Sequence, residues 1–423
     1  MEWTEITLGD YIEVLTDYHA NGAYEKLKAN VELKSEKDFA VMIRTLNFER
    51  GDFEKELIYI NEKEYNFLSK SKVYPGDILM NKIADAGSVY CMPDLNCPVS
   101  LAMNLFLIRL KPSLNQKFMY YMMKFYEPYI KLYANGAATL TITKNSVRNL
   151  KFNVPGRDTQ DKIVALVSAY DDLIVNNLKR IKLLEEMVQI TYEEWFVRMK
   201  FPGHEKVEID SETGLPHGWV RATCYDYMEV LSGGTPKTSI EEYWNGDIKF
   251  FTPKDAQQGF FTGNTEKTIT SIGLKKCNSK LYDTGTIFIT ARGTVGKLNL
   301  AHEPMAMNQS CYALRGKEGV PQYFLFCVLS KAIDAFKGAA NGGVFDAIVV
   351  DTFRFLPFVR PESHLVQKFD QIVSPIFDSI CNLLEQNKKL QEARDILLPR
   401  LMTGMIDIDK VELPEALLER INK

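Results

Sequence analysis

The sequence contains little that would support a membrane, metal or disulfide role. Its seven cysteines include no Cys-x-x-Cys pair, and its five histidines have no metal-ligand spacing. No apolar run approaches the ~18 residues of a membrane span, and the acidic start at residues 1–5 lacks the apolar stretch of a signal peptide. We therefore expect a cytoplasmic chain with reduced thiols, no bound metal and no membrane contact.

Motifs of several enzyme classes are missing as well. No Asn-Pro-Pro-aromatic or Asp-Pro-Pro-aromatic motif of an amino-methyltransferase occurs, and no glycine-rich loop is placed to hold S-adenosylmethionine. Pro93-Asp94 is not followed by the Glu-x-Lys of a nuclease centre. The stretch Gly-Thr-Val-Gly-Lys at 293–297 is too short for a phosphate loop and is followed by Leu298 instead of Ser or Thr, so we expect a turn there. The chain is predicted to be non-catalytic and to hold no cofactor.

The charge balance also restricts the function. Lys and Arg number 51 against 55 Asp and Glu, which gives a net charge of −4. A free-standing nucleic-acid binder usually has a basic balance. Such a role therefore requires that positive charge be confined to one face or be supplied by a partner.

The 423 residues are enough for two to four domains, and the sequence repeats itself once. The glycines at 76 and 87 recur, with the same separation, at 285 and 296. Other segments recur in the same order: Ala-Met-Asn at 102–104 returns at 306–308, residues 152–155 resemble 358–361, and Trp3 corresponds to Trp219. The shared order of these matches predicts an internal duplication, and the slight drift in their offset is typical of loop insertions and deletions.

Each half is predicted to have the same two-part plan. About 150 residues of short β-branched and aromatic runs, separated by glycines, indicate strands; these runs include 40–43, 105–108, 249–251 and 286–289. Short helices are expected at 119–133 and 323–336. Each half then ends in one long helix, the first from just after Pro155 to about Arg198 and the second from Ser363 to Pro399.

Both long helices carry an apolar stripe with spacings of three, four and seven, which lets two helices pack as a coiled coil. Helices of ~35–40 residues would be ~55–60 Å long, more than a domain of this size can cover, so we expect them to pair rather than pack only on their own domains. The residues predicted to pair are Ile174, Leu178, Ile181, Leu184 and Val188 in the first helix, and Phe369, Ile372, Ile376, Leu383, Leu390 and Leu397 in the second.

These features predict a mixed α+β fold in five segments. They are a first domain at 1–155, a long helix at 156–203, a second domain at 204–361, a second long helix at 362–404 and a tail at 405–423. The two domains are expected to be related by the duplication, and the two helices are expected to connect them as a spacer.

Tandem domains, each followed by a long helix and without catalytic motifs, resemble the specificity subunits of type I restriction–modification systems. The match spans nearly the whole chain and is clearest from Glu194 onward. Its segments are Glu-Trp-Phe-Val-Arg-Met-Lys-Phe-Pro-Gly at 194–203, Leu-Pro-His-Gly-Trp at 215–219, Gly-Gly-Thr-Pro at 233–236, Glu-Tyr-Trp-Asn-Gly-Asp-Ile at 242–248, Met-Asn-Gln-Ser at 307–310 and Leu-Pro-Arg-Leu-Met-Thr-Gly at 398–404. The first domain departs more, with Asn-Gly-Ala at 21–23 where the second has Gly-Gly-Thr at 233–235.

The resemblance implies a fold and a role. Residues 1–155 and 204–361 would be two target-recognition domains, and the long helices would form an antiparallel coiled coil with a pseudo-twofold axis. Each domain would read one half of a split double-stranded DNA target. The chain would join two methyltransferase subunits that hold S-adenosylmethionine and, in the full nuclease, two restriction–translocase subunits that consume ATP with Mg²⁺.

Candidate DNA contacts are polar or basic residues on glycine-rich loops, where the backbone can approach DNA closely. They are Asn21, Arg44, Asn47, Lys82 and Lys144 in the first domain, and Thr235, Lys237, Lys254, Arg292 and Thr294 in the second. For each of them an ordinary solvated surface role is the alternative. Asn104 and Asn308 repeat between the halves, so we expect them to hold a turn rather than to read different half-sites.

Two other functions stay open at this point. A repeat adaptor would bridge two copies of a partner protein without contacting DNA, and a DNA-binding assay with the partner methyltransferase separates it from a specificity subunit. An enzyme would carry a centre that forms only in space, because residues scattered in the sequence can form a triad. Assays of the isolated chain for methyl transfer and DNA cleavage address that second alternative.

Overall fold

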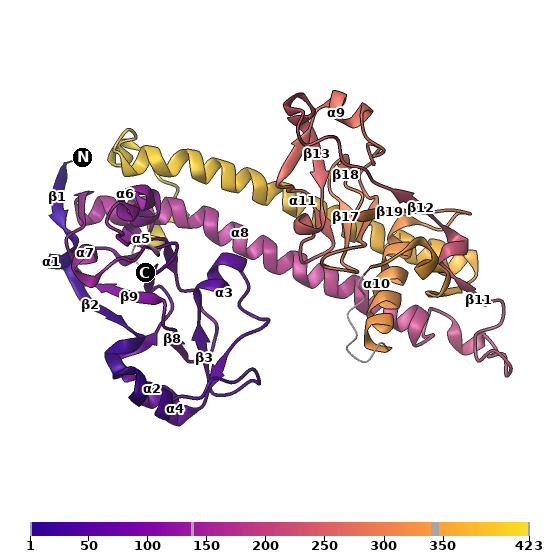
Figure 1. Cartoon of the computed structure of the whole chain (residues 1–423), viewed down its shortest axis with the longest axis horizontal. Coiled ribbons are helices and arrows are strands. Elements are labelled where there is room, and N and C mark those ends of the chain that lie inside the picture. The colour runs from indigo at the N-terminus through magenta and orange to yellow at the C-terminus, as the bar shows by residue number, and fades with distance from the viewer. Residues whose placement is uncertain (1, 137–138, 340–346, 422–423) are drawn as a thin grey trace. The chain divides into compact units, whose positions relative to one another are not determined.

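The computed structural model describes residues 2–136, 139–339 and 347–421 (Figure 1). The chain divides into two compact units, the first made of residues 1–174 and 389–423 and the second of residues 175–388. Each unit contains one β-rich region and part of both long helices, whereas the sequence-based division placed each helix in a segment of its own. None of the helices in the described ranges is long and apolar enough to cross a membrane.

The described residues of the first unit form two four-stranded sheets and one two-stranded pair. The strands are β1 Trp3–Thr7, β2 Ile12–Asp17, β3 Ala40–Ile43, β4 Tyr59–Ile60, β5 Lys72–Val73, β6 Ile78–Asn81, β7 Val89–Cys91, β8 Val99–Leu101, β9 Leu105–Leu110 and β10 Lys151–Pro155. One sheet has the antiparallel order β2-β9-β6-β7, and the other has the order β4-β3-β8-β5 with β3 parallel to β8. The pair β1-β10 joins the two ends of the β-rich region, with Trp3 opposite Pro155.

The second unit repeats this arrangement with small changes. Its strands are β11 Val220–Thr223, β12 Met228–Ser232, β13 Trp244–Phe251, β14 Phe261–Thr262, β15 Lys267–Ile269, β16 Ile287–Thr290, β17 Leu298–Ala301, β18 Met305–Met307, β19 Cys311–Gly316 and β20 Pro357–Arg360. Within its described residues the two sheets have the orders β12-β19-β16-β17-β14 and β15-β13-β18, and β11 pairs with β20. The strands expected at 40–43, 105–108, 249–251 and 286–289 are observed in β3, β9, β13 and β16.

Short helices cover the sheets, and two long helices run through both units. In the first unit the short helices are α1 Leu8–Tyr11, α2 Tyr24–Asn30, α3 Thr45–Arg50, α4 Glu62–Phe67, α5 Gln116–Phe125, α6 Glu127–Lys131, α7 Lys144–Arg148 and α12 Glu415–Ile421, and in the second they are α9 Ser271–Lys275 and α10 Gln322–Ala339. The long helices are α8 Arg157–Tyr192, which continues as a π-helical turn at Glu193–Val197, and α11 Ser363–Met402.

The internal duplication is confirmed by the matching order of the elements. One constant offset relates the starts of β9 and β19, of α5 and α10, and of α8 and α11, and a slightly larger one relates β6 and β16. Side-chain contacts repeat too: Gln116 donates to the carbonyl of Ile108 at 2.9 Å, and Gln322 donates to the carbonyl of Leu314 at 2.9 Å. The two units are variants of one fold.

The cores of the two units are built at matching positions. In the first unit the core includes Ile78, Ile108, Phe118 and Ile163, and in the second it includes Ile287, Leu314, Phe324 and Phe369. Each of these side chains contributes roughly 1.5–3 kcal/mol when it is fully buried. Strand, short helix and long helix therefore meet in one core in each unit, which fixes where the loops at the strand ends lie.

Within the first unit, the segments of α8 and α11 lie antiparallel. Asp171 of α8 forms an ion pair with Arg394 of α11 at 2.7 Å. Nearer the start of α8, Thr159 donates to Asp409, which follows the end of α11, at 2.9 Å. Tyr121 of α5 donates to the second oxygen of Asp171 at 2.5 Å, and burial together with the Asp171 charge raises the pKa of this tyrosine, so that it remains a donor.

Within the second unit, the helix segments are also antiparallel. Asn177 of α8 donates to the side-chain oxygen of Asn387 of α11 at 2.9 Å, and both residues are buried. Further along α8, the ring of Tyr192 lies 6.1 Å from that of Phe369, near the start of α11. A buried polar pair of this kind favours one register, because any shift would place an amide opposite an apolar side chain.

Most residues of the predicted stripes are packed. Those buried are Ile174, Ile181, Val188, Phe369, Ile376 and Leu383, and those partly buried are Leu184, Leu390 and Leu397. Leu178 and Ile372 are exposed, so their assignment to the packed stripe is wrong. The neighbouring residues Asn177 and Val373 are the ones that are buried, because they continue the alternating spacing of three and four that the other buried positions follow.

The prediction that the second long helix ends at Pro399 is wrong. Helix α11 continues to Met402 and also passes through Pro375. Proline removes a backbone donor from a helix interior, at a cost of about 3 kcal/mol. The last turn still forms because Leu401 and Met402 are buried in the core of the first unit, and Thr403 donates to the carbonyl of Pro399 at 3.0 Å.

We expect Asn177→Ala to lower the free energy of unfolding by about 1–3 kcal/mol, because it removes a hydrogen bond from a buried site. Asn176→Ala is the matched control, since Asn176 precedes it on the same helix and is exposed; its effect should stay below about 0.5 kcal/mol. Denaturant titration of the purified chain measures both variants. Equal losses would contradict a register-fixing role for the Asn177–Asn387 pair.

Candidate nucleic-acid interface

Several loops of the first unit meet at one edge of its two sheets, which we call the first loop edge. It is defined by the residues that follow the ends of β2, β3 and β6, together with Lys144 at the start of α7. The two sheets are tied together there, because Thr45 donates to the side-chain oxygen of Asn81 at 2.7 Å. This contact joins the segment after β3, which carries the predicted residue Arg44, to the end of β6, which Lys82 directly follows.

Asp17, the last residue of β2, holds two lysines at the first loop edge. Its carboxylate pairs with Lys82 at 2.8 Å and with Lys144 at 3.0 Å. Burial opposes ionisation of Asp17, but the two ammonium groups outweigh burial and hold the pKa of this carboxyl below its ordinary value. Three charged groups in contact leave one net positive charge at the edge.

The side chains at the first loop edge differ in their freedom. Lys82 lies over the ring of Phe106 at 5.4 Å and its side chain is 12% exposed, so it is largely confined. The side chain of Lys144 is 37% exposed. Arg44 donates to the carbonyl of Glu56 at 2.6 Å, and its buried Nε has no hydrogen-bond partner within the described ranges.

The two predicted asparagines of the first domain are engaged inside the unit. Asn21 donates to the carbonyl of Tyr18 and to Ser71, and accepts from the backbone of Lys70. Asn47 is buried, accepts from the backbone of Arg44 and donates to a carbonyl in the same turn. Both side chains are held by contacts within the unit, and their role as DNA contacts stays a prediction.

The second unit has a corresponding edge, which we call the second loop edge, formed by the residues that follow β12, β13, β16 and β18. The backbone of Gly234 donates to the carbonyl of Met307 at 3.1 Å. A Cβ at Gly233 would lie 2.1 Å from the carbonyl of Asn308, so this close approach requires glycine. The predicted residue Thr235 is exposed and donates to the side-chain oxygen of Gln309.

The other predicted residues of the second domain also lie at this edge. Thr294 donates to the carbonyl of Pro253 at 3.2 Å, which joins the loops after β13 and β16. Lys254 is 3.7 Å from Glu266, but its side chain is 80% exposed, so this contact is weak. Lys237 and Arg292 are exposed.

The predicted turn at residues 293–297 is confirmed, and so is the predicted turn role of Asn308. Gly296 donates to the carbonyl of Thr290 at 2.8 Å, and Gly293 and Gly296 both have positive φ, so residues 293–297 form a hairpin turn between β16 and β17. Asn308 accepts from the backbone of Ser310 at 3.0 Å, as a turn-forming asparagine does. In the first unit, the backbone of Lys82 donates to the carbonyl of Asn104 at 2.8 Å.

Sequence reasoning missed an exposed apolar stripe on α8, which we call the outer stripe. It consists of Leu183, Met187, Ile190 and Val197 in the second unit, and all four are exposed. Their spacings of four, three and seven place them on the face opposite the packed residues Ile181 and Val188. The regular spacing of these apolar residues could have indicated the stripe from the sequence. It was overlooked because the same helix also carries the packed stripe.

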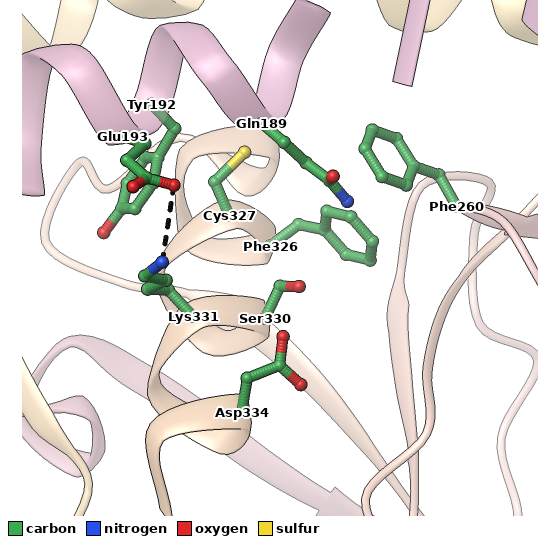
Figure 2. Close-up of a pocket in the computed structure, with 9 residues that line it drawn as sticks. All are labelled: Gln189, Tyr192, Glu193, Phe260, Phe326, Cys327, Ser330, Lys331 and Asp334. Carbon is green, nitrogen blue, oxygen red and sulfur yellow. Dashed lines mark hydrogen bonds and ion pairs between the residues drawn. The ribbon is translucent and has the colours of Figure 1, made fainter. Parts of the chain in front are cut away.

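A cavity of about 130 Å³ lies between α8 and α10 of the second unit, and Figure 2 shows the side chains that line it. It is lined by Gln189, Tyr192, Glu193, Phe260, Phe326, Cys327, Ser330, Lys331 and Asp334. Lys331 and Glu193 form an ion pair at 3.4 Å at its wall. Among the described residues, no group of three His, Cys, Asp or Glu side chains could hold a metal. We attribute the cavity to the packing of α8 against α10.

Known proteins resemble the chain along most of its length. The type I restriction enzyme MjaIX specificity subunit of Methanocaldococcus jannaschii is 24% identical over 373 residues, covering 84% of this chain and 85% of the relative. The HindI specificity subunit of Haemophilus influenzae is 23% identical over 414 residues, covering 82% and 90%. The crystal structure of a type I restriction–modification S subunit from M. genitalium has a TM-score of 0.56 at 15% identity, covering 95% of this chain and 96% of that one.

The family match lies in both halves of the duplication. Residues 1–186 and 216–393 each match the family described as the type I restriction modification DNA specificity domain. Both loop edges lie inside these matched segments, as do the packed stripes of the long helices except for Val188 near the end of α8 and Leu397 near the end of α11. The chain therefore belongs to the family of type I restriction modification DNA specificity domains, with one copy in each half.

Proposed function

We propose that the chain reads a split DNA target, with one half-site at each loop edge, as the specificity subunit of a type I restriction–modification complex. The observation that carries the proposal is the duplication of the loop edge with different polar side chains in each copy. Polar and basic groups on closely packed loops suit the major groove, where all four base pairs present distinct donors and acceptors. The chain itself is proposed to be non-catalytic and to act in the cytoplasm.

The two half-sites are expected to differ. The first loop edge carries Arg44 and an ion triad around Asp17, whereas the second carries the neutral pair Thr235–Gln309 together with the exposed cations Lys237, Lys254 and Arg292. A charged cluster favours phosphate and guanine contacts, while Thr and Gln side chains suit adenine and mixed contacts. The residues Asn104 and Asn308, which repeat, would take no part in this difference.

The outer stripe is suited to bind a partner protein through an apolar helix. An exposed stripe at helical spacing is the surface that a second amphipathic helix covers. Helix α11 repeats one of its positions, since Ile396 is the counterpart of Ile190 at the offset that relates α8 to α11, and both are exposed. We assign these surfaces to two methyltransferase subunits, which would carry S-adenosylmethionine, and further restriction–translocase subunits would supply ATP and Mg²⁺ chemistry. The net charge of −4 supports a partner that adds phosphate contacts.

The test uses the chain with its methyltransferase. The wild-type complex should bind its target tightly with a steep salt dependence, because neutralised phosphates release counterions, and the chain alone should bind weakly. The double variant Met187→Glu, Ile190→Glu should lower methyltransferase binding by at least about tenfold, since two charges would be placed in an apolar contact. Size-exclusion chromatography and DNA-binding titrations at one salt concentration measure both effects.

A matched control keeps the added charge but moves it off the outer stripe. Leu178→Glu and Gln189→Glu add the same two negative charges at exposed positions of the same helix that lie off the outer stripe, and they should leave methyltransferase binding nearly intact. A complex that bridges two partner copies but binds no DNA would favour the adaptor alternative. Equal specific affinity for DNA with and without the methyltransferase would contradict the proposal that the methyltransferase adds phosphate contacts.

A further inference from the structure

We propose that Asp17 is a built-in competitor for a DNA phosphate, holding Lys144 in the free protein and releasing it to the backbone of bound DNA. The inference rests on the proposed function, because it concerns the first loop edge as a DNA-binding surface. The Asp17 carboxylate would thereby regulate how tightly the first loop edge binds DNA. Asp17 would restrain binding to any DNA, so that base contacts decide where the complex settles.

The contacts of the triad show which lysine can leave. Lys82 is anchored by its ion pair with Asp17, by the ring of Phe106 at 5.4 Å and by backbone hydrogen bonds to Asn104 and Ile142 on either side. Its side chain is only 12% exposed. Lys82 is therefore a structural partner of Asp17. We expect it to contribute less to DNA binding than Lys144.

Lys144 is the releasable member. Its ion pair with Asp17 is longer, at 3.0 Å, and its side chain is 37% exposed. Removing one partner from a buried carboxylate is costly when the charge is left alone. Here Asp17 keeps Lys82 after Lys144 has moved, so no buried charge is left unpaired. Two cations on one anion make the exchange of one of them feasible.

The second unit lacks the carboxylate at the matching position. Asp17 lies opposite Phe106 in the pairing of β2 with β9. The counterpart of Phe106 in β19 is Tyr312, since both are the second residue of their strands. The residue opposite Tyr312 is Ser232, which carries no charge. No anion therefore stands at this place in the second sheet to hold a lysine.

The two lysines have no counterparts either. At the offset that relates β6 to β16, Lys82 corresponds to Ala291, because each directly follows its strand. At the offset that relates α5 to α10, Lys144 corresponds to Val350. Both replacements are apolar. The restraint is therefore expected only at the first loop edge.

The experiment uses the complex of the chain with its methyltransferase and two DNA duplexes, one with the mapped target and one unrelated. Affinity is measured over a series of KCl concentrations. Asp17→Asn should tighten binding to both duplexes by about twofold to fivefold, the range of a partly exposed ion pair. Lys144→Met should weaken binding to both and reduce the salt slope by about 0.9, the value for one phosphate contact.

Two further variants make the test specific. In the background of Lys144→Met, Asp17→Asn should give no gain, because the competitor has lost the group that it competes for. Lys82→Met should leave the salt slope unchanged. The pair Lys34–Asp38 is the matched control, with side-chain exposures of 35% and 29%, and it precedes the start of β3 whereas the loop edge follows its end. Lys34→Met and Asp38→Asn should have no effect on either quantity.

The outcomes separate the inference from the proposed function. Two results would overturn the role of Asp17, provided that the wild-type complex binds DNA normally. One is an unchanged salt slope in Lys144→Met, and the other is unchanged affinity in a folded Asp17→Asn. Thermal unfolding shows whether Asp17→Asn is folded, and the more exposed Lys144→Met gives the slope test independently. Failure of the wild-type complex to bind any DNA would instead overturn the proposed function.

Discussion

Lengthening both long helices by four residues at the boundary between the compact units is expected to widen the unread gap of the DNA target by one or two base pairs. The insertions are placed between Ile174 and Val175 and between Lys388 and Lys389, where the chain divides into its two units. Four residues add ~6 Å of helix and a rotation of only ~40°, and one base pair rises ~3.4 Å. The bases of both half-sites should stay the same, because no loop edge is altered.

The structure explains why both helices must be lengthened together. Contacts such as Asp171–Arg394 in the first unit and Asn177–Asn387 in the second join the two helices on either side of the insertion points. An insertion in α8 alone would force one of these contacts out of register, so we expect loss of folding or of methylation. Mapping methylated sites in the doubly extended protein gives the result. An active protein with an unaltered gap would show that the helices do not set the spacing.

The long helices and the duplication could be predicted because their signals extend over many residues. The stripe through Ile181, Val188 and Ile376 and the nearly constant offset between the halves both depend on numerous positions, so single errors do not remove them. Leu178, Ile372 and Pro399 were the errors, and in each case packing of a neighbouring residue prevailed over the local pattern. Tertiary contacts decide the exact face and end of a helix that periodicity only outlines.

The candidate site was predicted less completely, for a physical reason. Arg44, Lys82 and Arg292 were predicted as basic residues on glycine-rich loops, and each lies within two residues of the end of β3, β6 or β16. The sequence did not show that the side chains of Asn21 and Asn47 are hydrogen-bonded within the unit, since asparagine suits a turn as well as a DNA contact.

Asp17 gave no sequence signal at all. Its partners Lys82 and Lys144 lie 65 and 127 residues away, and only the fold brings them together. The outer stripe also required the structure, because the sequence analysis named only the packed face of α8 and not the second apolar face, which is exposed.

The central claim is that each half reads its own half-site, and an exchange of one recognition domain tests it most directly. Residues 1–155 begin and end in one strand pair, where Trp3 lies opposite Pro155, so the exchanged segment closes on itself. Trp3 should be retained, because Gly404 of the C-terminal segment approaches its ring closely, with a Cβ there only 2.8 Å from the indole nitrogen. The reciprocal exchange of residues 204–361 is the control.

The measurement is the methylation map of the hybrid, assembled with the methyltransferase and compared with that of the wild-type complex. The account predicts that exchanging residues 1–155 replaces one half-site entirely, while the other half-site and the gap are unchanged. The control exchange should produce the opposite pattern. A hybrid that methylates the original target, or one in which both half-sites change together, would contradict it.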